Sequence, residues 1–157
     1  MIELNRVYTI TQAAKLSGLS ESTLRYYEMI GLINPIKRDP SSKHRVYSEE
    51  DINFIIAVAC LSTTGMSISD MRSYLKNRSK GTTAANEQIE LLESQKQRLV
   101  NEAHFIKLRQ RYVDTKIEFW QAVISGDAER IERAKVSANT ITKELNLSRE
   151  QEQDNKN

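Results

Sequence analysis

Two clusters of cationic and hydroxyl-bearing side chains stand close together near the start of the chain. In the segment LSESTLRYYEMIGLINP, residues 19–35, Arg25 is followed directly by Tyr26 and Tyr27. Within residues 37–45, two lysines and two arginines face a single aspartate. Guanidinium and phenol groups both suit the oxygens of an anion such as phosphate. Whether the two clusters act together depends on the elements that position them.

The first cluster is expected on the second of two short helices. Thr11 can cap a helix that stops at Gly18, and Ser20 can open the next one. In that second helix Leu24 and Tyr27 can point inward, while the arginine lies toward another face. Two short helices joined by a glycine-containing turn predict a helix-turn-helix. Taken alone, the same residues also fit an amphipathic turn with a solvated arginine.

The second cluster lies in the segment IKRDPSSKHRVY, which follows the helix-stopping pair Asn34-Pro35. Two brief extended pieces around residues 39–42 are expected there, because Asp, Pro and Ser are turn residues. The sequence therefore predicts a basic hairpin, or wing, directly after the helix-turn-helix. The alternative interpretation is that this segment is a charged surface loop with no binding role.

A third helix is expected to start at Ser48 and to carry the lone cysteine. Three acids follow this serine, which favours a helix start. Ile52, Ile55 and Ile56 then share an apolar stripe with Cys60, so this face is expected in the core. A fourth helix is expected from Ser67.

A long helix with a narrow apolar stripe is expected from about residue 85 to 125. Its apolar residues recur every seven positions from Leu92 to Trp120. A second, partial row of apolar residues adds Ile117 to the predicted contact surface. Such a stripe is buried only against another helix, and a second copy of the chain is the natural partner, which predicts a coiled-coil homodimer. The predicted dimerisation residues are Leu92, Leu99, Ile106, Val113, Ile117 and Trp120.

Composition narrows the classes of protein. A single cysteine excludes an internal disulfide framework and any multi-thiolate metal site within one chain, and no metal or cofactor is expected. The apolar runs are too short for a membrane span, and the N-terminus lacks a signal peptide, so a cytoplasmic protein is expected. No catalytic motif is present and only two histidines are available, which argues against an enzyme.

Several motifs occur in an order that resembles the MerR family of bacterial transcription regulators. They are YTITQAAKLSGLSESTLRYYEMIGLI, HRVYSEEDINFI, GMSISDMRSYL and a long helix containing DTKIEFW, from Tyr8 to about Trp120. The resemblance implies a homodimer whose long helices pair antiparallel, bound to double-stranded promoter DNA together with RNA polymerase. Family members commonly activate by bending and untwisting that DNA, which uses its deformability.

The resemblance and the helix pattern together predict a mainly α fold. A winged helix-turn-helix DNA-binding domain is expected over residues 1–80 and an antiparallel coiled-coil dimerisation helix over 81–125. A short C-terminal helix is expected over 126–147, and a disordered polar tail over 148–157.

The resemblance also assigns DNA-binding roles. In the recognition helix these fall on Ser22, Thr23, Arg25 and Tyr26, and in the wing on Lys37, Arg38, Lys43, Arg45 and Tyr47. Arginine can contact phosphate or pair with guanine, and the other side chains suit phosphate oxygens. One departure concerns the wing, because family wings usually carry a glycine where this chain has Lys43-His44. Asp39-Pro40 is expected to make the turn instead.

Cys60 lies in CLSTTGMSI, which is similar to a stretch of the aldehyde- and electrophile-responsive MerR subgroup. There a lone cysteine is the proposed sensing residue. Its place near a helix C-terminus and on an apolar stripe disfavours the thiolate, so an inert buried cysteine is the alternative. A non-covalent effector, held for example by Phe119, Trp120 and Ile124, and a coiled-coil protein-interaction module also stay open.

Overall fold

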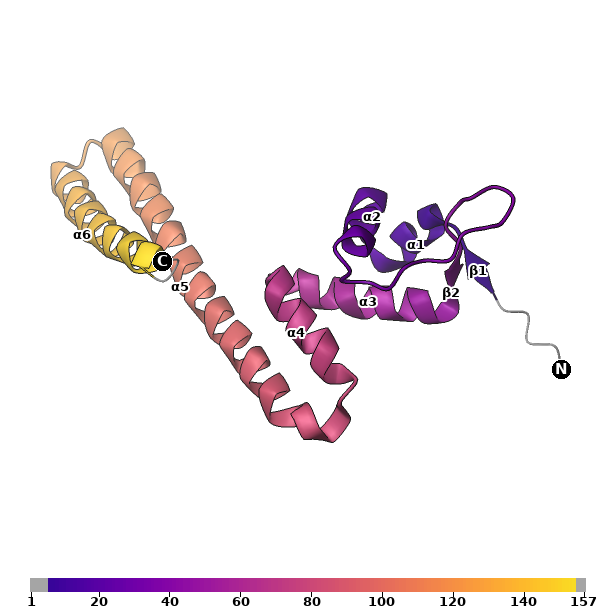
Figure 1. Cartoon of the computed structure of the whole chain (residues 1–157). Helices are drawn as coiled ribbons and strands as arrows, with labels where there is room; N and C mark the ends of the chain where they lie inside the picture. Colours follow the sequence, from indigo (N-terminus) through magenta and orange to yellow (C-terminus); the bar gives the residue numbers. More distant parts are fainter. Residues whose placement is uncertain (1–5, 155–157) are drawn as a thin grey trace. The chain divides into compact units, whose positions relative to one another are not determined.

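The computed structural model of the chain describes residues 6–154, with side chains to residue 151 (Figure 1). Most of these residues are helical, which confirms the predicted mainly α fold. The chain divides after Gln95 into two compact units. The elements in chain order are β1 (Val7–Tyr8), α1 (Ile10–Ser17), α2 (Glu21–Met29), β2 (Tyr47–Ser48), α3 (Glu49–Thr63), α4 (Ile68–Arg78), the 3-10 turn η1 (Gly81–Ala84), α5 (Ala85–Ser125) and α6 (Ala128–Asp154).

Side-chain caps determine where the helices of the first unit begin. The Thr9 hydroxyl accepts from the Gln12 amide and the Gln12 side chain accepts from the Thr9 amide, so the cap of α1 is Thr9, two residues before the predicted cap at Thr11. This reciprocal capping box satisfies two backbone donors, which a cap at Thr11 would not. Ser20 and Ser48 cap α2 and α3 as predicted.

A small sheet fixes the base of the wing. β1 pairs antiparallel with β2, which places Tyr8 opposite Tyr47. Ahead of β2, Arg38 and Arg45 form an isolated antiparallel bridge, and the Val46 amide donates to the Lys37 carbonyl at 2.8 Å. The predicted hairpin after α2 is therefore present. The buried core beneath it is Ala13, Leu24, Tyr27, Leu32, Ile33, Ile36, Tyr47, Ile52, Ile55, Val58, Met66 and Met71.

Two glutamine amides tie the first turns of α5 to the helices before it. The Gln88 Nε2 donates to the Tyr74 carbonyl at 2.9 Å, and the Gln95 Nε2 donates to the Thr64 carbonyl at 2.7 Å. Thr64 ends α3, where carbonyl groups lack partners within the helix, so the glutamine satisfies one of them.

The second unit is a helical hairpin formed by α5 from residue 96 onward and α6. Gly126, at φ 70, makes the turn, and the Asp127 carboxylate accepts from two amides at the start of α6. The Arg130 guanidinium donates to Glu118 at 2.8 Å across the hairpin. The buried residues between the helices are Leu108, Ala122, Ala134, Ala138 and Ile141.

The C-terminal helix is longer than the sequence predicted. α6 continues to Asp154, whereas a limit at residue 147 and a disordered tail from 148 were expected. Residues 148–154 consist mainly of Arg, Glu and Gln, which are good helix formers, so a helix already packed against α5 can extend through them. Polarity alone indicated only that the segment is not buried. The end of the expected tail, 155–157, lies outside the described residues.

Candidate nucleic-acid interface

The exposed side of α2 carries the polar residues predicted for the recognition helix. The Ser20 hydroxyl lies 2.9 Å from that of Ser22 and 2.8 Å from that of Thr23, so the first turn presents a cluster of hydroxyl groups. Tyr26 is 47% exposed on this helix, while Tyr27 is buried. The predicted division between inward and outward faces of α2 is therefore correct.

Arg25 also lies on the exposed side of α2. Its Nη2 pairs with Glu21 Oε2 one turn earlier at 3.0 Å. Because both side chains are well exposed, this i,i+4 pair is weak and can exchange for a phosphate.

The opposite end of α2 holds a carboxylate that the sequence analysis missed. Glu28 Oε2 accepts from Arg45 Nε at 3.0 Å, and its Oε1 lies 3.6 Å from Arg38 Nη2. The Glu28 side chain is only 14% exposed and that of Arg45 only 19%. The two arginines are 10 and 17 positions from Glu28 along the chain, so helical spacing gave no signal for this contact. The pair joins the recognition helix to the wing.

A single aspartate organises the tip of the wing. The Asp39 Oδ1 accepts from the Ser41 hydroxyl at 2.6 Å and amide at 2.9 Å, and from the Ser42 amide at 2.7 Å. These hydrogen bonds, that of the Ser41 side chain first, hold the pKa of Asp39 well below its ordinary value. Lys43 has φ 62, a left-handed conformation that glycine adopts most easily. A turn built on Asp39 is thus confirmed, with Lys43 at the strained position.

The recognition helix and the wing line a shared depression. A pocket of about 460 Å³ is lined by Thr9, Ile10, Thr11, Arg25, Arg38, Lys43, His44 and Arg45. Four of these side chains are cationic, and they come from α2 and from both sides of the wing turn. Such a surface suits a polyanion, since phosphate contacts are made mainly by arginine, lysine and hydroxyl groups. We call these four residues, Arg25, Arg38, Lys43 and Arg45, the basic groove.

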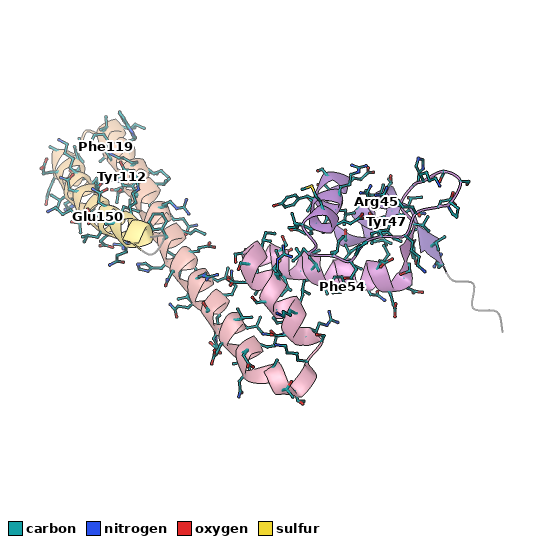
Figure 2. All side chains as sticks on the ribbon, in the orientation of Figure 1. Arg45, Tyr47, Phe54, Tyr112, Phe119 and Glu150 are labelled. Carbon is teal, nitrogen blue, oxygen red and sulfur yellow. The ribbon has the colours of Figure 1, made fainter. Side chains whose placement is uncertain are left out.

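Two predicted wing residues lie elsewhere. Lys37 lines a different depression, next to Glu49, Glu50 and other residues at the start of α3. Tyr47 is fully buried, so its predicted contact with DNA is wrong. The residue belongs to β2, where the pleat turns its ring into the core below the wing; Figure 2 labels it beside Arg45. Its hydroxyl has no hydrogen-bond partner among the described residues, and burial raises its pKa.

Cys60 is exposed, which corrects the expectation that it lies on the core face of α3. The buried residues of α3 are Ile52, Ile55, Val58 and Ala59, so the stripe centres near Ile55 and Cys60 falls beyond its edge. Ile56, one turn before the cysteine, is also partly exposed. Burial therefore does not oppose access to this thiol in the single chain.

Among the described residues, no cluster of histidine, cysteine and acidic side chains could hold a metal ion.

The six predicted dimerisation residues form an exposed apolar seam along α5. Their exposed fractions lie between 42% and 61%: Leu92, Leu99, Ile106, Val113, Ile117 and Trp120. α6 packs against a different face of α5, where Leu108 and Ala122 are buried. Trp120 and Ile124 are 61% and 86% exposed, so they do not enclose a small-molecule pocket with Phe119. Within the described part of the chain, no other element packs over this seam.

A helix-turn-helix followed by a paired basic wing defines a winged helix-turn-helix protein. The family described as MerR HTH family regulatory protein matches residues 8–78, which span α1 through α4 and the wing. The chain belongs to this MerR family.

Three similar proteins illustrate the relationship. The regulator AdhR of Bacillus subtilis is 40% identical over 91 residues, which cover 58% of this chain and 64% of AdhR. A crystal structure of HiNmlR, a MerR family regulator lacking the sensor domain and bound to promoter DNA, is 27% identical, with a TM-score of 0.65 over 80% of this chain and 96% of that one. A MerR family structure from Listeria monocytogenes is 30% identical, with a TM-score of 0.62 over 82% and 97%.

Among the residues that the structure describes, none of the helices combines the length and apolar character needed to cross a membrane.

Proposed function

We propose that the chain is a homodimeric transcription regulator that binds and distorts promoter DNA, together with RNA polymerase on the same promoter. The observation that carries this proposal is the basic groove, which combines cations of the recognition helix and the wing in one depression. The relative HiNmlR was crystallised on promoter DNA. The match covers 96% of HiNmlR and 80% of this chain, which supports promoter DNA as the ligand here.

The exposed seam supports the homodimer. An apolar row at seven-residue intervals is the pattern of a coiled coil, and its exposure in one chain is what an unpaired half would show. Two chains joined along α5 carry two recognition helices, one from each chain. A duplex that contacts both must adopt a matching shape, so DNA deformation becomes part of the binding energy.

The salt dependence of binding tests this function. A promoter-length duplex is expected to bind with a steep fall of log K against log salt concentration, because each neutralised phosphate releases counterions. Lys43→Gln should reduce that slope by about 1 and weaken binding on every sequence alike. Lys135→Gln, on the exposed surface of α6, serves as the control and should leave the slope unchanged. Undetectable binding would instead favour the coiled-coil interaction module.

A second proposal concerns control of the regulator by electrophiles at Cys60. The exposure of this side chain supports it, because a thiolate must reach its reactant. Addition of the sulfur to an aldehyde carbonyl forms a hemithioacetal, in which the thiol proton passes to the former carbonyl oxygen. The added polar group near the end of α3 can shift the dimer between two DNA-bound shapes.

Transcription with and without formaldehyde or methylglyoxal tests the switch. Cys60→Ala is expected to keep DNA binding and to lose the response. Thr63→Ala is the control on the same helix, because Thr63 is exposed and its hydroxyl donates only to the Ala59 carbonyl of α3. A normal response of Cys60→Ala would make the cysteine structural and favour a non-covalent effector.

A further inference from the structure

Two glutamates of α2, seven residues apart, each hold an arginine of the basic groove. Glu21 pairs with Arg25 at 3.0 Å, and both side chains are more than a third exposed. Glu28 differs, because its side chain is 14% exposed and its two oxygens face two arginines of the wing. Arg45 Nε lies at 3.0 Å and Arg38 Nη2 at 3.6 Å.

Charge alone makes both glutamates unfavourable for DNA binding. A carboxylate beside the groove repels phosphates and cancels part of the positive charge that attracts them. Removing either one should then tighten binding by a similar factor. The two carboxylates are not equivalent in structure, however, since Glu28 is largely buried and holds two arginines of the wing. Glu21 is more exposed; it pairs with one arginine of its own helix and accepts from the Thr11 hydroxyl of α1 at 2.8 Å, without contacting the wing.

The geometry of Glu28 gives it a second effect of opposite sign. A carboxylate between two guanidinium groups forms charge-assisted hydrogen bonds that fix both side chains. Arginine side chains that are already ordered lose less conformational entropy when they bind a phosphate. Without Glu28, the mostly buried Arg45 would also lose its counter-charge, and the wing would lose its link to α2.

We propose that Glu28 is a positioning residue for DNA binding, which holds Arg38 and Arg45 so that the wing and α2 present one continuous groove. This inference rests on the proposed DNA-binding function. It predicts that removing a negative charge at residue 28 weakens DNA binding, against the expectation from charge.

Glu28→Gln and Glu21→Gln form a matched pair, because each removes one negative charge from the same helix. Their affinities for a promoter-length duplex are measured by fluorescence anisotropy at several salt concentrations, with thermal melting as a check on folding. Glu21→Gln is expected to bind about twofold tighter. Glu28→Gln is expected to bind about tenfold more weakly. The NMR signal of the Arg45 Nε–H group should shift in Glu28→Gln and stay in place in Glu21→Gln.

Two further variants keep the inference testable should Glu28→Gln lose its fold. Arg45→Lys keeps the positive charge but lacks the planar guanidinium that Glu28 holds, so weaker DNA binding is expected. In a background that carries both Arg38→Gln and Arg45→Gln, Glu28→Gln should no longer weaken binding, because both of its partners are absent.

The outcomes separate this inference from the proposed function. If the wild-type chain binds no duplex, the DNA-binding function is wrong. If the wild type binds, but Glu28→Gln binds as tightly as Glu21→Gln or Arg45→Lys binds like the wild type, Glu28 has no positioning role.

Discussion

At the scale of single residues, Lys43 has opposite effects on the stability of the chain and on its proposed DNA binding. Its φ of 62 lies in a region where an L-residue with a side chain pays about 1 kcal/mol or more, whereas glycine does not. Lys43→Gly removes this strain but gains unfolded-state entropy, so the net stability should rise by about 0.5 kcal/mol. DNA affinity should fall, since a cation of the groove is lost. Chemical denaturation and anisotropy measure the two effects.

His44→Gly is the matched control for Lys43→Gly, because it adds flexibility at the next residue, where no positive φ is relieved. It should lower the stability slightly. A loss of stability in Lys43→Gly of the same size as in His44→Gly would contradict the claim of strain at Lys43.

The buried hydroxyl of Tyr47 is a second residue whose replacement is informative. A buried polar group without a partner costs free energy, so Tyr47→Phe should stabilise the chain by about 1 kcal/mol. DNA binding should be unchanged, because the ring lies in the core. Tyr26→Phe, at an exposed position, should leave the melting temperature unchanged and weaken DNA binding. Weaker DNA binding by Tyr47→Phe would instead place its hydroxyl at the interface.

At the scale of elements, the wing is stabilised by the ionised form of Asp39. Its folded pKa is lowered by hydrogen bonds from Ser41 and Ser42, so the protons bind more weakly in the folded state. The stabilisation is therefore fully present above the unfolded pKa of about 3.9 and is lost as the pH falls through the lower folded value. An NMR titration of the Asp39 carboxyl should show no protonation near pH 4.

Asp39→Asn provides the comparison for this titration. Its side-chain amide oxygen accepts hydrogen bonds without a charge, so the Ser41 and Ser42 amide signals of this variant should lose the pH dependence that the Asp39 carboxylate gives them. An Asp39 midpoint close to 3.9 in the wild type would contradict the hydrogen-bond network.

Elements whose signals are local were predictable from the sequence. Ser20, Ser48 and Gly18 mark helix ends within a few residues, and seven-residue spacing identified the seam of α5. Contacts between distant segments were not predictable in this way. Glu28 finds its partners on another element, and Tyr47 was assigned to the interface because a wing position says nothing about which face of a two-residue strand is buried. Cys60 was misplaced because the buried face of α3 includes Val58, whereas the sequence pattern had assigned Ile56 and Cys60 to that face.

At the scale of the whole molecule, the seam of α5 and the packing of α6 have separable roles. Val113 is 55% exposed in the single chain, so Val113→Asp should leave the hairpin folded but place a charge within the seam of the proposed dimer. Analytical ultracentrifugation is expected to show a shift toward monomer, and cooperative DNA binding should be lost because a monomer carries only one recognition helix. Val136→Asp, at a similarly exposed position of α6, should stay dimeric.

Leu108→Ala completes this comparison, because Leu108 is buried between α5 and α6 rather than on the seam. It should cost about 2–5 kcal/mol of stability through the cavity it leaves.

Loss of dimers in Val113→Asp without loss of helix content by circular dichroism would show that the seam acts between chains. A wild-type chain that is monomeric at micromolar concentration would carry only one recognition helix, which would remove the reason for the DNA to bend.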